Sequence, residues 1–314
     1  MTAQLHRLPA ATTAAGSSPA RRWRRTRDWA VAYAFVAPLV VLFLVFSLYP
    51  FLRTLQLSFT DWDGLSASFG YVGLDNYVQS LRDRVWWSSL WHGLLFAVVA
   101  LTLMQGLSLL LALGVNRRRR SAAFYRTAFY LPPVLSGIVV ALVWRWIYQP
   151  YGGPLAELFT ALGIESLARP WLAESGTALW AVSIASVWQG VGNAFLLFLA
   201  ALQSIPEELN EAAAVDGANP WQRFRAVTLP WLTPTIGMVS VLTLLGAMQI
   251  FNLVLAMTGG GPGYATEVPV LHIYRAAFEF SQFGYATALS VVLGIILLAV
   301  SALAMRVSRR DRTR

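Results

Sequence analysis

The chain alternates long apolar segments with shorter polar connections. Six apolar segments reach about 20 residues, the length that crosses the hydrocarbon core of a bilayer. They cover residues 30–50, 88–115, 125–148, 177–203, 235–256 and 287–306. This pattern predicts an all-α polytopic membrane protein with six transmembrane helices and a polar loop, residues 204–233, between the fourth and the fifth.

Composition supports this fold class. Hydrophobic residues make up 57% of the chain and charged residues only 12%, against about 25% charged residues in soluble domains. Residues 1–20 are rich in Ala, Thr, Ser and Pro without periodicity, and with the arginine cluster that follows they predict a disordered tail over residues 1–28. The membrane domain is expected to cover residues 29–306, followed by a short basic tail at 307–314.

The positive charge predicts the orientation in the membrane. The basic charge comes from 24 arginines, because the sequence contains no lysine. Most arginines lie before Trp29, in the connection that holds Arg117–Arg120, in the 204–233 loop and after residue 305. The positive-inside rule then places both termini and this loop in the cytoplasm. The arginines flank apolar segments and do not line one face, which argues against nucleic acid as a partner.

Several kinds of chemistry are disfavoured by what the sequence lacks. Without cysteine there is no disulfide or thiolate site, and without lysine there is no Walker A loop to bind nucleotide phosphates. The histidines, His6, His92 and His272, are scattered, so neither a metal site nor a cofactor is expected. The six apolar segments contain no Asp or Glu, which argues against an intramembrane acid–base enzyme and against an ion-coupled secondary transporter. The chain is therefore not expected to be an enzyme.

The 204–233 loop has the residues of two short helices set at an angle. Ser204 with Pro206 and Glu207 is typical of a helix start, and Gly217 supplies the left-handed residue that ends a helix. Asn219-Pro220 begins a second helix, which the Leu229-Pro230 pair is expected to stop. The alanines of the first helix present a small, flat face that suits docking against another protein. The alternative is an amphipathic helix that lies on lipid headgroups.

The order of residues in this loop resembles the cytoplasmic "EAA" loop of permease subunits in bacterial binding-protein-dependent ABC importers. The matching residues are Glu211-Ala212-Ala213, Asp216-Gly217-Ala218, Phe224 and Leu229-Pro230. The resemblance implies that Glu211, Ala212, Ala213, Asp216 and Gly217 couple this chain to a separate ATPase. It further implies a second permease subunit, a P-loop ATPase dimer and an extracytoplasmic solute-binding protein as partners, in the lipid of the bacterial cytoplasmic membrane.

Further motifs resemble the sugar-importer branch of that family. They are Thr258-Gly259-Gly260-Gly261-Pro262, Tyr274-Arg275-Ala276-Ala277-Phe278 and Gly284-Tyr285-Ala286. With them the resemblance covers about residues 30–306 and implies carbohydrate transport into the cytoplasm. A glycerol-phosphate or other sugar-phosphate ester remains an alternative. An intramembrane arginine pair would favour that ester. Apart from Arg126 and Arg306, at the predicted cytoplasmic ends of their segments, the apolar segments offer only Arg145, near the end of one of them.

Four amide side chains in the apolar segments are candidates for the solute pathway. Gln189 and Asn193 are four residues apart and therefore share a helix face, and Gln249 and Asn252 are three apart. Amides both donate and accept hydrogen bonds, and neighbouring aromatic rings such as Phe251 can cover the apolar face of a sugar. The alternative is that these amides hydrogen-bond neighbouring helices.

Overall fold

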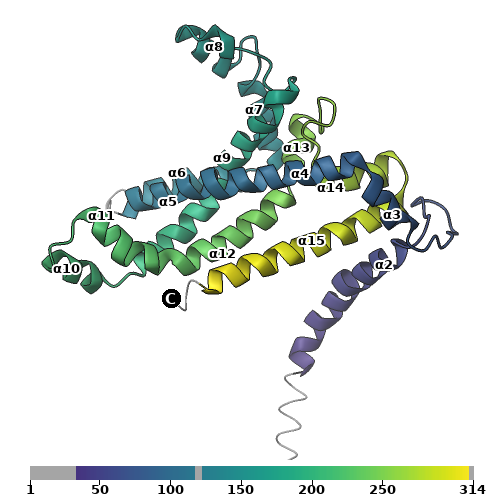
Figure 1. Cartoon of the computed structure of the whole chain (residues 1–314), viewed down its shortest axis with the longest axis horizontal. Helices are drawn as coiled ribbons and strands as arrows, with labels where there is room; N and C mark the ends of the chain where they lie inside the picture. Colours follow the sequence, from purple (N-terminus) through teal and green to yellow (C-terminus); the bar gives the residue numbers. More distant parts are fainter. Residues whose placement is uncertain (1–32, 117–121, 311–314) are drawn as a thin grey trace, which may run out of the picture. The chain divides into compact units, whose positions relative to one another are not determined.

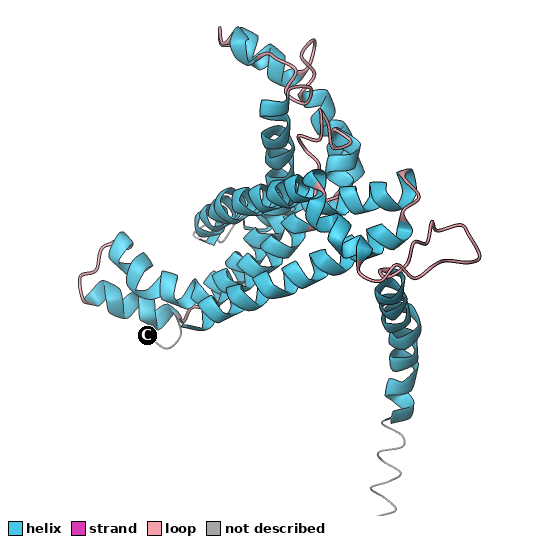
Figure 2. Ribbon diagram, turned by 45° about the vertical axis from the view of Figure 1, so that its right-hand side comes forward, coloured by secondary structure: helices cyan, strands magenta, loops and turns pink. Residues whose placement is uncertain are grey.

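The computed structural model describes residues 33–116 and 122–310. Within these ranges the regular secondary structure is helical, and the only extended pairing is an isolated bridge between Thr60 and Tyr71. Figure 2 shows helices joined by loops, without a strand in the part that is described. The predicted all-α membrane fold is confirmed.

Five helices in the described ranges are long and apolar enough to cross a membrane. They are Tyr33–Leu57, Arg84–Asn116, Ser175–Gln203, Pro220–Met248 and Phe283–Ala304. A sixth is obtained if the bent pair Ala123–Val134 and Gly137–Ile147 is taken as one span. The number agrees with the prediction, and the boundaries differ in ways that matter for the site.

The chain divides into two compact units, Met1–Thr54 and Leu55–Arg314. Most of the first membrane helix belongs to the first unit and includes a π-helical turn, η1 (Leu44–Leu48), before α2 (Tyr49–Leu57). The helix therefore continues past residue 50, where the sequence pattern placed its end. Along this helix the apolar side chains are exposed, as expected of a segment whose surroundings are lipid or another chain.

The second unit contains all the remaining helices. In chain order they are α3 (Asp75–Arg82), α4 (Arg84–Val99), η2 (Ala100–Met104), α5 (Gln105–Asn116), α6 (Ala122–Val134), α7 (Gly137–Ile147), α8 (Pro154–Ala161), η3 (Glu165–Leu167), α9 (Ser175–Gln203), α10 (Glu207–Val215), α11 (Pro220–Arg223), η4 (Phe224–Thr228), α12 (Leu229–Met248), α13 (Asn252–Met257), α14 (Pro269–Tyr274), η5 (Arg275–Glu279) and α15 (Phe283–Arg310). Figure 1 shows α10 and α11 at one end of the long helices, with α3 and α14 at the opposite end.

Two apolar cores hold this unit together. The larger surrounds the fully buried Trp86 and joins residues of α4, α7, α9 and α12–α15. The smaller lies nearer the α10 end, where Phe195 and Phe198 of α9 pack with Leu232 of α12. The central helix α9 contributes to both cores and packs along α5 and α6.

The third apolar segment was predicted as one span over residues 125–148, and the prediction of a continuous helix is wrong. It is broken between α6 and α7, which meet at 96°. Pro132 and Pro133 stand in the last turn of α6, where each lacks the amide hydrogen of a normal helical residue. Ser136 then caps α7 by accepting a hydrogen bond from the amide of Val139 at 3.3 Å. The proline pair and the serine cap account for the break.

The fifth segment also differs from its predicted limits of 235–256. Its helix ends at Met248, and α13 starts only at Asn252. Neither Gly nor Pro lies in between. Phe251 leaves helical geometry, and its ring packs against that of Tyr274 with centroids 5.2 Å apart and the planes tilted by 52°, so the break coincides with a tertiary contact. At its other end this helix begins at Pro220, well before residue 235.

Some predicted features fall outside the described ranges. The 1–28 tail and the arginines Arg117–Arg120 are among them, as are residues 311–314. The last helix, α15, continues to Arg310, so the start of the predicted basic tail, 307–310, is helical.

Two glycines on α9 give a matched stability prediction. A methyl group at Gly192 would meet the backbone carbonyl of Phe129 and the ring of Pro133, whereas one at Gly190 would meet only the flexible sulfur end of Met104. Both substitutions gain the same helix propensity. We therefore expect Gly192→Ala to lower the free energy of unfolding of the detergent-purified protein by about 1–3 kcal/mol, seen as a lower melting temperature. Gly190→Ala should leave both nearly unchanged. Equal melting temperatures would contradict the close packing of α6 on α9.

Candidate functional site: a polar loop and a hollow beside two helix breaks

The first helix of the 204–233 loop ends as its sequence predicts. Gly217 has φ +78°. The amide of Ala218 donates to the Ala213 carbonyl at 3.0 Å, and the amide of Gly217 donates to the Ala214 carbonyl at 3.1 Å. These two bonds make a Schellman motif, which satisfies the last carbonyls of α10 and turns the chain sharply. The bend at Gly217 is confirmed.

The start of α10 differs from the prediction. The residue at its cap position is Pro206, without a side-chain cap bond. Ser204 instead closes the preceding helix, α9. Its hydroxyl donates to the Ala201 carbonyl at 2.8 Å and accepts from the Trp231 indole at 3.2 Å. The serine thus ties the end of α9 to the start of α12.

The second helix of the loop begins as predicted but does not stop. Asn219 and Gln222 form a reciprocal capping box. The helix then runs through the Leu229-Pro230 pair into α12 without interruption. The π-helical turn η4 immediately before this pair changes the bonding pattern, which accommodates the missing amide hydrogen of Pro230. The predicted stop is therefore wrong, and α10 is attached to a rigid 29-residue helix.

The structure presents the five predicted coupling residues on one short exposed segment. Glu211, Ala212, Asp216 and Gly217 are exposed, and Ala213 is half-buried. Near them Val215 is 88% exposed. A helix with small side chains and an exposed apolar residue at its end suits docking into a groove of another protein.

A hollow of about 600 Å³ opens in the second unit, a volume typical of small-molecule sites. It lies beside both helix breaks, since Pro133 and Gly137 line it from α6 and α7, and Phe251 and Asn252 from the α12–α13 break. Non-helical backbone at membrane depth is tolerated where it lines a cavity or is buried in protein. The two breaks and the hollow are therefore parts of one feature.

Three of the four candidate amides lie at this hollow. Gln189, Asn193 and Asn252 line it, whereas Gln249 does not. Gln249 is an exposed residue at the end of α12. The amide of Gln189 also donates to the Leu135 carbonyl at 3.0 Å, next to the α6–α7 break. Gln189 thus has a packing contact as well as a place at the hollow.

The residues that line the hollow are uncharged. They are Ala, Leu, Val, Ile, Gly, Met, Phe and Pro together with Ser186, Gln189, Asn193, Thr243 and Asn252. Arg145 is not among them, and its guanidinium donates to the carbonyl of Ala256 at 3.4 Å, which links α7 to α13. The polar groups at this hollow can therefore donate and accept hydrogen bonds without a formal charge.

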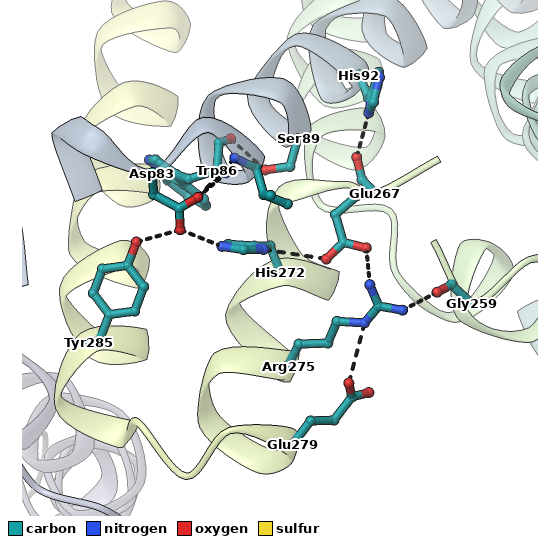
Figure 3. Close-up of polar contacts among 11 residues, drawn as sticks. Asp83, Trp86, Ser89, His92, Gly259, Glu267, His272, Arg275, Glu279 and Tyr285 are labelled. Atoms are coloured by element: carbon teal, nitrogen blue, oxygen red, sulfur yellow. Dashed lines mark hydrogen bonds and ion pairs between the residues drawn. The ribbon is translucent and has the colours of Figure 1, made fainter. Parts of the chain in front are cut away.

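The structure also assembles a charged cluster that sequence reasoning missed. Figure 3 shows Asp83, Glu267, His272 and Arg275 converging. Asp83 directly follows α3 and His272 belongs to α14, so the cluster lies at the end of the unit that carries these helices. Two of the histidines, which the sequence predicts to be scattered, both lie beside Glu267: His92 contacts its backbone carbonyl at 2.9 Å and His272 lies 3.4 Å from its carboxylate. Asp83 and His272 are far apart in sequence, so no local spacing signals their contact. Only the proximity of Glu267 and Arg275 along the chain could have suggested part of the cluster.

Comparison with known proteins places these features in context. Residues 106–312 match the family described as "Binding-protein-dependent transport system inner membrane component". The chain is 36% identical to the "Multiple sugar-binding transport system permease protein MsmF" of Streptococcus mutans, over 88% of this chain and 95% of that protein. It is 34% identical to the "sn-glycerol-3-phosphate transport system permease protein UgpA" of Agrobacterium fabrum, over 87% and 93%.

A solved structure shares the fold. A chain in the crystal structure of a bacterial ABC transporter involved in the import of the acidic polysaccharide alginate superimposes with a TM-score of 0.81 at 25% identity. The match covers 92% of the present chain and 99% of that chain. The likeness therefore extends over nearly the whole membrane domain.

Proposed function

Because this chain belongs to the family of binding-protein-dependent transport system inner membrane components, we propose that it forms half of the pathway by which an ABC importer brings a carbohydrate into the cytoplasm. The chain is a transport subunit of the ABC importer class, and ATP is hydrolysed in a partner chain. The observation that carries the substrate proposal is the uncharged, amide-bearing hollow beside two broken helices.

The coupling proposal rests on the exposed loop. In this scheme α10 docks on the ATPase, with Glu211, Ala212, Ala213, Asp216 and Gly217 at the contact. Because α11, η4 and α12 make one continuous helix, a push on the loop would be transmitted as a rigid movement to the α12–α13 break, where the helix ends at the hollow. Movement of one helix end would thereby alter access to the hollow.

The remaining partners follow from the class of transporter. We expect a second permease subunit against the exposed side of the hollow, a P-loop ATPase dimer at the α10 end and an extracytoplasmic solute-binding protein at the opposite end. The arginine distribution supports an orientation with both termini and the loop in the cytoplasm. The multi-pass subunit would then lie in the bacterial cytoplasmic membrane.

The hollow favours a neutral sugar over a phosphate ester. A phosphate group is usually bound by arginine or by helix N-termini. The hollow is lined by uncharged residues, although α7 and α13 both begin beside it. Arg145 is engaged with the Ala256 carbonyl. A glycerol-phosphate or sugar-phosphate solute remains the second candidate because the relative UgpA is named for such a solute.

Affinity purification of the chain from native membranes in mild detergent tests the importer assignment. We expect a P-loop ATPase and a second permease to copurify, and the complex in liposomes to take up solute only with ATP and its binding protein. Screening that binding protein against neutral sugars and phosphate esters would decide the solute class. Transport by this chain alone without ATP would overturn the assignment in favour of a secondary transporter.

A matched pair of amide substitutions tests the pathway. Asn252→Leu removes a hydrogen-bonding group from the hollow, whereas Gln249→Leu makes a comparable change three residues away, outside it. We expect Asn252→Leu to lower uptake by about tenfold, the loss that one unpaired hydrogen bond to solute can cause, with complex assembly unchanged. Gln249→Leu should transport normally. Equal uptake by both variants would mean that Asn252 does not contact the solute.

A further inference from the structure

Asp83 sits where three segments of the second unit meet. Its carboxylate caps α4 by accepting from the amides of Val85 and Trp86 at 2.8 and 3.0 Å. It also accepts from the hydroxyl of Tyr285 on α15 at 2.8 Å, and lies 3.1 Å from Nε2 of His272 on α14. One carboxylate thus joins the start of α4 to α14 and α15.

Glu267 makes a second junction in the loop before α14. Its side chain is fully buried and forms an ion pair with Arg275 at 2.7 Å. The same guanidinium donates to the carbonyl of Gly259. Three glycines of this loop, Gly259, Gly260 and Gly263, have positive φ, a conformation that glycine adopts readily. The hydroxyls of Thr258 and Thr266 close the loop at 2.7 Å, and the Arg275 guanidinium ties it to Glu267 and so to the cluster.

His272 bridges the two junctions. Its Nε2 faces Asp83, and its Nδ1 lies 3.4 Å from the Glu267 carboxylate. The other titratable or charged groups of the cluster are Tyr285 on α15, Arg275 and Glu279 after α14, and His92 on α4. Only a protonated imidazole can donate to both carboxylates at once. A hollow of about 240 Å³, lined by Asp83, His272, Arg275 and Tyr285 among others, lies against the cluster.

We propose that Asp83, Glu267, His272 and Arg275 form a latch that holds the ends of α4, α14 and α15 together, and that protonation of His272 closes it. The cluster joins segments that are distant in sequence, and through Arg275 it also holds the carbonyl of Gly259 in the loop before α14. The transport consequence, control of access at this end of the bundle, rests on the proposed function. The latch itself can be measured without transport.

The expected pH dependence follows from the two bridging partners. Burial lowers the pKa of His272, but the bonds and charges of Glu267 and Asp83 outweigh it and leave the pKa above its ordinary value. Burial likewise opposes ionisation of Asp83, while the Trp86 amide, Tyr285 and His272 hold its pKa below the ordinary value. The His272 contribution is fully present below about pH 6.5, the ordinary histidine pKa, and is lost as the pH rises through the raised pKa. The Asp83 contribution is lost only in strong acid.

Thiol labelling tests the latch, because the chain has no native cysteine. Ala276→Cys places a single thiol in the buried lining of the smaller hollow, and Ser88→Cys places one on the exposed surface of α4. Each variant is labelled with a small maleimide in the purified chain together with the subunits that accompany it. The ratio of the two rates at each pH removes the intrinsic pH dependence of the thiol.

We expect the Ala276→Cys to Ser88→Cys ratio to rise about tenfold from about pH 6 to about pH 9, since the loss of one charge-assisted hydrogen bond is worth at least that factor. With His272→Gln added, the ratio should be flat across this range. Tyr285→Phe, which removes one contact of Asp83, is the milder variant if His272→Gln does not purify as a single species. It should raise the ratio at every pH and keep its pH dependence.

The outcomes separate the latch from the transport assignment. A flat ratio in the otherwise unmodified chain overturns the latch, as does a pH dependence that His272→Gln leaves intact. A pH-dependent ratio in a complex that lacks ATP-driven uptake would instead support the latch and overturn the proposed function.

Discussion

Gly217→Pro is expected to abolish most ATP-driven uptake while the chain still inserts in the membrane and assembles with its partners. Proline holds φ near −65°, whereas Gly217 has φ +78°. Proline also lacks the amide hydrogen that Gly217 donates to the Ala214 carbonyl. Losing the turn and the bond should displace α10. If this raises the activation free energy of transport by more than about 1.4 kcal/mol, the rate falls tenfold or more. The transport rate is measured as uptake of labelled solute into proteoliposomes.

Gly217→Asn is the matched control for this experiment. Asparagine tolerates the left-handed region better than other side chains, and a Cβ added at Gly217 meets no neighbour within this chain. The substitution therefore keeps the bend and adds only a short polar side chain at the contact with the ATPase. We expect Gly217→Asn to keep most of the uptake. Full uptake by Gly217→Pro, with ATPase activity still stimulated by solute-loaded binding protein, would show that the bend does not position the coupling contact.

The loop was largely predictable because its signals are local. The bend at Gly217 and the capping box at Asn219 depend on residues within a few positions of each other, and the structure has both. The errors in the loop have local causes too. Ser204 is a good cap residue, but here it ends α9. Pro206 disfavours helical geometry at Ile205, the residue before it, so α10 begins only after the proline. The Leu229-Pro230 pair was expected to act as a breaker, and a π-helical turn accommodates it.

The two helix breaks show the limit of hydropathy. Periodicity and apolar length find a segment that can cross a membrane but do not say whether it is straight. Pro132-Pro133 marked the first break in the sequence, yet the apolar run continued through it. The second break, before Asn252, has no sequence marker, and the contact that accompanies it, between Phe251 and Tyr274, is long-range. Because the sequence does not locate this break, it also could not show that Asn252 lines the hollow and Gln249 does not.

The charged cluster was not predictable because its contacts are long-range. Asp83 and His272 are 189 residues apart in the sequence, so neither carries a local signal of the other. Their contact depends on α4 and α14 packing together, which the single sequence does not reveal. Once the helices are packed these charges are buried, and a buried charge that loses its partner destabilises the fold strongly.

Replacing the buried acid of this cluster should have the largest effect on stability. Glu267 and Glu279 both pair with Arg275, at 2.7 and 3.5 Å, but Glu267 is fully buried and Glu279 is 47% exposed. Glu267→Gln leaves the guanidinium without its buried counterion, and breaking such a pair costs about 3 kcal/mol or more. Glu279→Gln removes an exposed pair four residues along the chain, worth about 0.3–0.5 kcal/mol. Thermal unfolding in detergent should therefore show a large fall for the first variant and almost none for the second.

A double substitution separates lost charge pairing from lost packing. If the cost of Glu267→Gln arises from the unpaired Arg275, then Glu267→Gln combined with Arg275→Gln should be less destabilising than the sum of the two single variants, because residues in direct contact are coupled. Additive losses would mean that Glu267 stabilises this end of the bundle by shape and hydrogen bonding alone. Since Arg275 also holds the Gly259 carbonyl, we expect the double variant to recover only part of the loss. The glycine loop would then remain loosened even after the charges have been removed.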